Sequence, residues 1–330
     1  MIRFLKFSFT FAVLTLSFFR HDAAAQEKVR IAYSAISGAM LTPWVGAEAG
    51  IFKKHGLDAQ LIYIAGGPTA AAALVGGDVE VSLASGDGLI RTRLQGVELV
   101  SVADMTSTLV FSLMSRPEIS SARELKGKRL GASRFGSSSH AALLAGLKHF
   151  NIDPTEVTIL QMGGIPQILA GMEAGAISGG VLSPPINIKG KKLGMRELLE
   201  IGTLKIPFQT NTFIAKRDFI QKNPETIRRL MRSIVESIHR IKTDQAFTQK
   251  ALAKYTKIED PDILAETYRI FAQNYLARVP YPSEEAVKLR LAEFGAKDEK
   301  ARAANPRDFV DPRWLKELEE SGFIARLYKQ

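Results

Sequence analysis

Residues 129–150, RLGASRFGSSSHAALLAGLKHF, combine a predicted strand, a polar turn and a predicted helix. The strand covers 129–132, and the turn contains Arg134, Gly136 and three serines at 137–139. The apolar residues that follow recur at helical spacing, so the turn feeds the start of a helix. Free backbone N–H groups and the helix dipole favour an anion there. The turn is therefore predicted to be half of a ligand site, although a serine-capped helix start with nothing bound explains the same residues.

The first 25 residues have the composition of a secretory signal peptide. Arg3 and Lys6 precede an almost wholly apolar run at 7–19, and three alanines at 23–25 form a small-residue cleavage signal. The apolar run is shorter than the roughly 20 residues that a membrane-spanning helix needs. We therefore predict cleavage after Ala25 and a mature protein in the periplasm.

The charge balance and the cysteine count limit the classes of function. The 330 residues carry a net charge of +10, of which the predicted signal peptide contributes +2 and the mature chain +8. A basic surface suits an anionic ligand or an acidic partner, but the charges are scattered, so no nucleic-acid binding is expected. The chain has no cysteine, which excludes a thiol nucleophile and a cysteine-ligated metal.

Strands and helices alternate in two successive units. The first unit has four predicted strands, at 29–34, 61–64, 79–83 and 99–103. The second unit, within 112–207, has three, at 129–132, 157–160 and 180–182. This alternation predicts an α/β fold with mostly parallel sheets covered by helices. From Pro224 onward the chain is predicted to be mostly helical.

An internal repeat indicates that the two units are similar. ALVGGDVEVSLAS at 73–85 and GMEAGAISGGVLS at 171–183 each contain a helix end, a glycine turn, a strand and a final serine. In parallel α/β sheets, ligands bind beyond the carboxyl ends of the strands. If the two units face each other, these strand ends meet in one cleft.

Together these segments resemble the solute-binding proteins of ABC importers, in the branch for aliphatic sulfonates, taurine, nitrate and thiamine-pyrimidine precursors. The resemblance is carried by WVGAEAGIF at 44–52, GGDVE at 76–80 and ELKGKRLG at 124–131. It covers nearly all of residues 28–275. The family has a two-lobed periplasmic-binding-protein fold (type II), which closes on its ligand about two crossover strands.

The resemblance also implies where the lobes and the crossovers lie. The crossover strands fall at 109–114 and 208–214. Lobe 1 would comprise 26–110 and 208–330, including a helical C-terminal tail, and lobe 2 would comprise 111–207.

The implied ligand contacts come from loops that follow the strands of each lobe. These loop residues are Ser34, Ser37, Gly66, Gly67, Ser85, Gly86, Gly136, Ser137, Ser138, Ser139, Gly163, Gly164 and Ser183. Arg134 is expected to pair with an acidic ligand group or to steer it. Trp44, Phe135 or Phe208 is expected to cover an organic tail. Asp87 and Asp104 are candidate polar cleft residues that would repel an anion, and Asp87 is expected to cap the helix after it.

The resulting hypothesis is a monomeric solute-binding protein that passes a small anion, sulfonate- or carboxylate-like, to an ABC permease in the inner membrane. It needs no metal, cofactor or catalytic residue. Two alternatives stay open. One is an enzyme similar to the pyrimidine-precursor synthases, which rely on a cysteine-rich segment that this chain lacks. The other is a ligand-sensing subunit, which the sequence does not separate from a transport protein.

Overall fold

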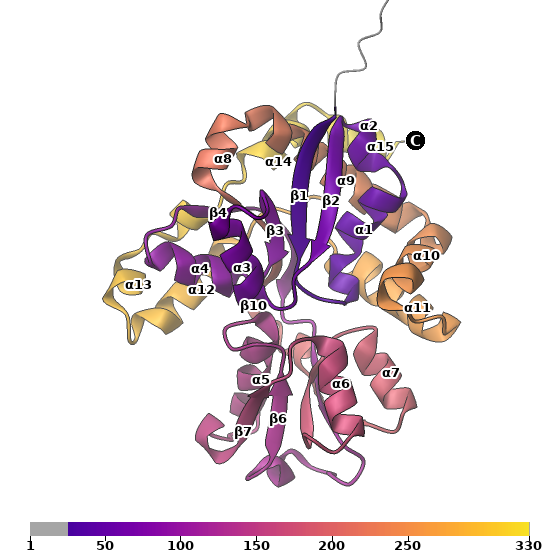
Figure 1. The fold of residues 1–330 in the computed structure, drawn as a ribbon, viewed down its shortest axis with the longest axis vertical. Coiled ribbons are helices and arrows are strands. Elements are labelled where there is room, and N and C mark those ends of the chain that lie inside the picture. Colours follow the sequence, from indigo (N-terminus) through magenta and orange to yellow (C-terminus); the bar gives the residue numbers. More distant parts are fainter. Residues whose placement is uncertain (1–25, 330) are drawn as a thin grey trace, which may run out of the picture.

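The computed structural model describes residues 26–329, which form two α/β lobes arranged along the long axis of the molecule (Figure 1). The signal peptide predicted for residues 1–25 lies outside the described residues. Each lobe is built on one five-stranded sheet, with strand orders β2-β1-β3-β10-β4 and β7-β6-β8-β5-β9. We call the lobe with the first sheet lobe 1 and the other lobe 2. The predicted two-lobed α/β fold is confirmed.

The two sheets share one topology. The strands of lobe 1 are β1 (Glu27–Tyr33), β2 (Leu57–Tyr63), β3 (Val81–Ala84), β4 (Leu99–Thr108) and β10 (Pro207–Lys216). Those of lobe 2 are β5 (Ser112–Ser115), β6 (Arg129–Ala132), β7 (Thr158–Gln161), β8 (Gly179–Leu182) and β9 (Arg196–Glu200). In each sheet three neighbouring strands are parallel, and the fourth, β10 or β5, is antiparallel to its neighbours. The seven strands predicted from the alternation are present, and the predicted crossover strands at 109–114 and 208–214 overlap β5 and β10. The strand β9 was not predicted.

The predicted repeat corresponds to equivalent elements of the two lobes. Gly77 directly follows α3 (Gly67–Gly76). Gly175 comes after α6 (Ile165–Glu173), with Ala174 between them. Both glycines have positive φ, +84° and +72°, which side-chain-bearing residues adopt at a cost. The left-handed turn lets each chain reverse from a helix into the next parallel strand, β3 or β8.

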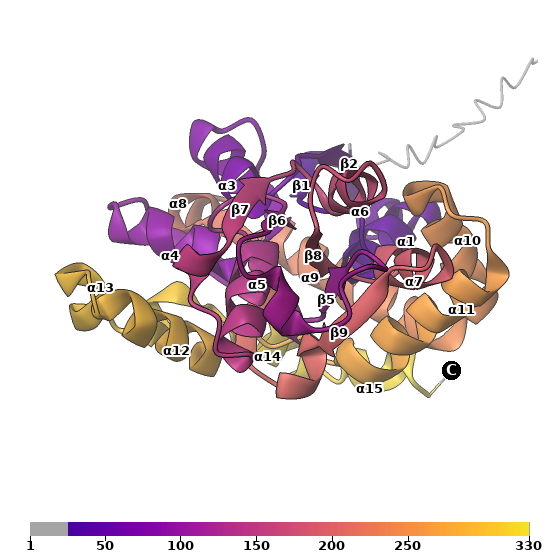
Figure 2. The same ribbon diagram turned by 90° about the horizontal axis from the view of Figure 1, so that it is seen from below.

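Helices cover both sheets, and most of those after residue 216 pack on lobe 1. The helices before this point are, besides α3 and α6, α1 (Leu41–Glu48), α2 (Ile51–Lys54), α4 (Gly86–Leu94), α5 (Ser138–His149) and α7 (Ile186–Lys192). Those after it are α8 (Arg217–Lys222), α9 (Pro224–Thr243), α10 (Gln245–Thr256), α11 (Pro261–Tyr268), α12 (Glu284–Gly295), α13 (Glu299–Ala303), α14 (Arg313–Glu320) and α15 (Phe323–Leu327). The views agree that α12 and α13 extend on one side of lobe 1, and α10 and α11 on the other (Figures 1 and 2).

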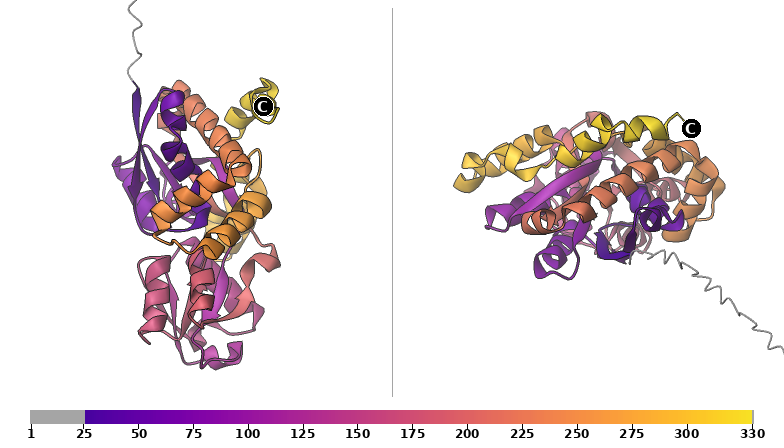
Figure 3. Two further views of the ribbon diagram at one scale, coloured as in Figure 1. Left: turned by 90° about the vertical axis from the view of Figure 1, so that its right-hand side faces the viewer. Right: turned by 90° about the horizontal axis from the view of Figure 1, so that it is seen from above.

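The C-terminal segment covers an edge of the lobe 1 sheet. It runs across one face of that lobe from α12 to α15 (Figure 3). Val310 forms a parallel bridge with Ser101 of the edge strand β4, and the Asp311 N–H donates to the Ser101 carbonyl at 2.8 Å. The unpaired backbone groups of an edge strand can pair with another chain. The C-terminal segment covers part of this edge and so blocks such pairing. Among residues 26–329, no helix combines the length and the apolar character that crossing a membrane requires.

Candidate functional site

A small cavity of about 30 Å³ lies between the lobes. Its lining side chains are small, hydroxyl-bearing or apolar, with a single amide and no charged group. The lining residues are Ser34, Ala35, Ser37, Ala39, Gly66, Gly67, Val110, Phe111, Ser133, Ser137, Ser138, Ser139, Gly164, Ile165, Ser183, Thr210 and Asn211. They come from loops after β1, β2, β6, β7 and β8 and from the two chain segments that cross between the lobes. The cavity therefore lies at the carboxyl ends of the parallel strands.

Three helices begin at this cavity. The first residues of α3, α5 and α6 are Gly67, Ser138 and Ile165, and all three line it. The first N–H groups of a helix have no partner inside the helix, and each helix start carries a partial positive charge of roughly half a unit. Among the described residues, the N–H groups of Ser138 and Ser139 meet no acceptor. The helix starts therefore favour a negative charge at the cavity, although no lysine or arginine is among the described residues that line it.

The serine loop before α5 is held by its own hydroxyl groups. Ser137 is the N-cap, and its Oγ accepts from the His140 N–H at 3.3 Å. The Oγ atom of Ser139 lies 2.7 Å from that of Ser133 and 2.9 Å from that of Ser137. The hydroxyl of Ser138 is different, because it has no hydrogen-bond partner within residues 26–329. Ser138 is therefore the serine of this loop whose side chain is free to contact a ligand.

Direct hydrogen bonds join the lobes around the cavity. Ser183 Oγ of lobe 2 donates to Ser37 Oγ of lobe 1 at 3.0 Å, and the Gly38 N–H donates to the Pro184 carbonyl at 3.0 Å. Arg134 Nε of lobe 2 donates to the Ala65 carbonyl of lobe 1 at 3.0 Å. The two lobes are thus joined through the loop after β1 and through the loop after β2.

Nine of the sixteen predicted site residues line the cavity. They are Ser34, Ser37, Gly66, Gly67, Ser137, Ser138, Ser139, Gly164 and Ser183. The residues that line the cavity but were not predicted are apolar or lie on the crossovers, with the exception of Ser133 in the serine turn. They are Ala35, Ala39, Val110, Phe111, Ser133, Ile165, Thr210 and Asn211. Thr210 and Asn211 lie on β10, which had been predicted as a crossover. A crossover passes between the lobes by definition. Including the residues of the predicted crossover at 208–214 among the site candidates would therefore have found Thr210 and Asn211.

The aromatic residues predicted to cover an organic tail do not line the cavity. Trp44 is fully buried in the core of lobe 1 and stacks on Tyr255 with ring centres 4.8 Å apart. Phe208 is also buried and lies under the guanidinium of Arg290, 5.2 Å from its ring centre. Both rings fill apolar interior space, as large aromatic side chains commonly do. Phe135 is half exposed and does not line the cavity.

The remaining predicted residues, Ser85, Gly86, Arg134, Gly136 and Gly163, do not line the cavity but lie in the loops and helix starts next to it. Ser85 is the N-cap of α4, and Gly86 is the first residue of that helix. Arg134 packs on Gly66, where an added Cβ would lie 2.7 Å from its Cδ. Gly136 and Gly163 supply the positive φ angles, +77° and +92°, of the turns before α5 and α6.

Asp87 and Asp104 are buried in polar networks and do not line the cavity. Asp87 is not the cap of α4, because Ser85 accepts from the Asp87 N–H at 3.3 Å. The Asp87 carboxylate instead pairs with Arg290 of α12. Asp104 accepts from the Ser283 N–H at 2.9 Å and from Gln209 Nε2 at 3.1 Å. Burial raises the pKa of Asp104 to about 6, although these hydrogen bonds favour the charged form.

The raised pKa of Asp104 predicts how stability depends on pH. Between about pH 4 and 6 the folded protein keeps a proton on Asp104 that the unfolded chain releases. The contribution of this group to stability is therefore complete below about pH 4 and is lost as the pH rises through about 6. As the pH rises from 4 to 6, we expect the unfolding free energy of wild type to fall relative to that of Asp104→Asn, by at most about 1.4 kcal/mol per pH unit.

The Asn variant is a suitable control, because Gln209 Oε1 is buried without a partner among the described residues. A flip of the Gln209 amide turns that oxygen toward the new Asn amide. Urea unfolding at pH 4, 5, 6 and 7 measures both proteins. If the unfolding free energies of the two proteins changed in parallel with pH across this range, Asp104 would be charged throughout.

No group of three or more His, Cys, Asp or Glu residues within 26–329 has the arrangement of a metal site.

Comparison with known proteins identifies a matching family model and several similar binding proteins. The NMT1/THI5-like family model matches residues 41–246. The taurine-binding periplasmic protein of Escherichia coli K12 is 31% identical over 177 residues, which are 52% of this chain and 53% of that protein. The chain thus spans about half the length of this relative.

Two solved structures are similar in fold. The alkanesulfonate-binding protein SsuA of Xanthomonas axonopodis, solved with bound MOPS, has a TM-score of 0.73 at 18% identity, covering 88% of this chain and 100% of that one. The periplasmic nitrate-binding protein NrtA of Synechocystis has a TM-score of 0.75 at 12% identity, covering 89% and 88%. At these identities the similarity is one of fold.

Proposed function

The chain belongs to the NMT1/THI5-like family, and on this basis we propose that it is the periplasmic solute-binding component of an ABC importer. The taurine-, alkanesulfonate- and nitrate-binding relatives support this role. The predicted signal peptide and the names of the periplasmic relatives support the location. Because both halves of the cavity lie on one chain, the protein acts as a monomer that presents its ligand to a membrane permease.

The proposed ligand is a small organic anion with a sulfonate or carboxylate group. The observation that carries this is the meeting of three helix N-termini with the serine hydroxyls at the cavity. Each helix start favours a negative charge by about 0.3–1 kcal/mol at exposed sites and by up to about 2 kcal/mol when partly buried. Val110, Phe111 and Ile165 add apolar surface for the organic part.

Ligand entry requires the lobes to separate. A cavity of about 30 Å³ has room for only about two water molecules. We propose that residues 26–110 with 208–330 and residues 111–207 move as two bodies about the crossover strands. Closure then surrounds the ligand, and the permease distinguishes the closed from the open form.

Binding, rather than catalysis, is the role that the lining favours. General acid–base catalysis needs a side chain such as His, Asp, Glu, Lys, Tyr or Cys within reach of the reacting atoms. Among the described residues, those that line the cavity include none of these types. We therefore propose that the ligand leaves unchanged, and we do not favour a synthase-like activity. A sensing role would use the same cavity and would differ in the partner protein.

A thermal-shift screen of the mature protein tests the ligand class. The panel contains alkanesulfonates, taurine, nitrate, aliphatic and aromatic carboxylates, and neutral aminopyrimidines. A ligand that binds only the folded state raises the melting temperature by mass action, and 100 Kd of ligand adds about 2.7 kcal/mol. We expect shifts with organic anions only. A shift confined to the neutral compounds would contradict the anion proposal but not the solute-binding role.

A further inference from the structure

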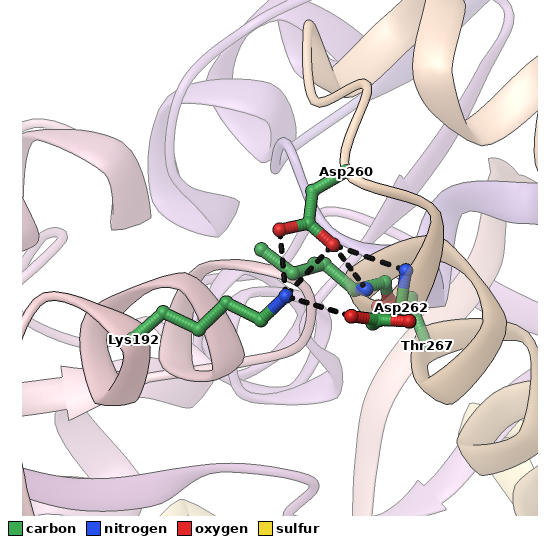
Figure 4. Close-up of polar contacts among 5 residues, drawn as sticks. Lys192, Asp260, Asp262 and Thr267 are labelled. Atoms are coloured by element: carbon green, nitrogen blue, oxygen red, sulfur yellow. Dashed lines mark hydrogen bonds and ion pairs between the residues drawn. The ribbon is translucent and has the colours of Figure 1, made fainter.

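A second contact between the lobes lies outside the residues that line the cavity. It joins α7 of lobe 2 to the turn that leads from α10 into α11 on lobe 1 (Figure 4). Lys192 is the last residue of α7, and Asp260 is the N-cap of α11. Figure 1 shows α7 and α11 on the same side of the molecule, one in each lobe.

The charged groups of this contact are close together. Lys192 Nζ lies 2.9 Å and 2.6 Å from the two carboxylate oxygens of Asp260, and 3.2 Å from Oδ2 of Asp262. Asp260 Oδ1 also accepts from the N–H groups of Asp262 and Ile263, at 3.0 Å and 3.2 Å. The helix start therefore fixes the Asp260 carboxylate in place, and less side-chain freedom is lost when Lys192 binds it.

Apolar packing accompanies the ion pairs. Ile258 and Ile263, on either side of Asp260, are 7% and 3% exposed. They belong to the buried cluster of lobe 2, which also contains Ile186 of α7. The two isoleucines of the lobe 1 turn thus pack against lobe 2, and Lys192 binds Asp260 next to this apolar contact.

We propose that Lys192, Asp260 and Asp262 form an inter-lobe clasp that stabilises the closed arrangement and slows ligand release. The clasp rests on the proposed closure of the lobes. Rotation about the crossover strands has to separate Lys192 from both carboxylates and return the three charges to water. Because the side chains of Lys192 and Asp260 are 44% and 35% exposed, the contribution is moderate and screened by salt.

Two substitutions remove the clasp without disturbing its surroundings. Lys192→Gln removes the positive charge, and Asp260→Asn removes a negative charge while keeping an N-cap for α11, since Asn and Asp cap equally well. The matched control is Lys189→Gln, because Lys189 is exposed on the same helix and makes no ion pair within residues 26–329. Since the chain contains no cysteine, Lys53→Cys and Glu173→Cys place one spin label on each lobe.

Pulsed electron–electron double resonance on the ligand-free protein then measures the distances between the two spin labels. The ratio of the short-distance to the long-distance population is the ratio of closed to open molecules. We expect each clasp variant to lower this ratio about two- to fivefold at 0.05 M salt, the range expected for exposed ion pairs. At 0.5 M salt the difference shrinks, and Lys189→Gln matches wild type at both salt concentrations.

Unchanged ratios in both clasp variants, or a wild-type distribution without the short distance, would overturn the clasp. The experiment uses no ligand, so its failure is distinct from an error in the proposed ligand class, which the thermal-shift screen decides.

Discussion

Replacing Arg290 by methionine is expected to lower the free energy of unfolding by about 3–5 kcal/mol. Arg290 Nε and a terminal guanidinium nitrogen each donate to one oxygen of Asp87, both at 2.8 Å. The Asp87 side chain is 3% exposed and that of Arg290 16%. Without the guanidinium, the buried Asp87 carboxylate loses both of these hydrogen-bond donors. Such a buried, unpaired charge is among the most destabilising changes a single substitution makes.

A double variant separates the pairing from the packing of Arg290. In Asp87→Asn with Arg290→Met the buried charge is absent, so most of the lost stability should return. Arg307→Met removes an arginine whose side chain is 78% exposed and should cost less than about 1 kcal/mol. Urea unfolding followed by circular dichroism measures all three. If Arg290→Met proved as mild as Arg307→Met, the pair would contribute little to the fold.

The Asp87–Arg290 pair also connects the C-terminal helices to the ligand cavity. Asp87 lies in the first turn of α4, whose N-cap Ser85 packs on Gly67 at the cavity wall. Arg290 belongs to α12. The segment after residue 275, to which the sequence assigned no role, therefore supports one wall of the cavity from behind.

Local patterns predicted most of the fold. The alternation of apolar runs with glycine turns located seven of the ten strands, and the predicted crossovers at 109–114 and 208–214 overlap two more, β5 and β10. The repeat predicted two similar lobes. The strand β9 was missed because its sequence, RELLE, carries charges at three of five positions and is exposed at both ends. Such a strand is recognised only once its pairing with β5 is known.

The candidate site was predicted less completely, for a related reason. Strand ends and helix starts have local signals, so the serine loop was identified. Which aromatic ring faces the cleft depends on packing between distant segments. Trp44 stacks on Tyr255, and Asp87 pairs with Arg290, 203 residues further along the chain. No periodicity within either segment encodes these partners.

Replacing Ser138 by aspartate is expected to weaken ligand binding at least about a hundredfold while leaving the fold intact. Ser138 is the first residue of α5, lines the cavity and uses its hydroxyl for no internal hydrogen bond among the described residues. A carboxylate about 5 Å from an anionic ligand group, at an effective dielectric constant of about 20, repels it by about 3 kcal/mol. The same carboxylate is favourable to the helix, because negative charge is stabilising at a helix N-terminus.

The matched variant Ser138→Asn decides what the helix starts recognise. Asparagine has nearly the shape of aspartate without its charge, so an anionic ligand should lose less than about tenfold in affinity. Calorimetry with the ligand identified by thermal shift measures both variants, and their melting temperatures without ligand should stay close to wild type. Equal losses for aspartate and asparagine would mean that size alone matters at this position, and that the bound group is neutral. A large loss for aspartate alone requires a negative charge at the start of α5, where the N–H groups of Ser138 and Ser139, which meet no acceptor within residues 26–329, lie at the cavity.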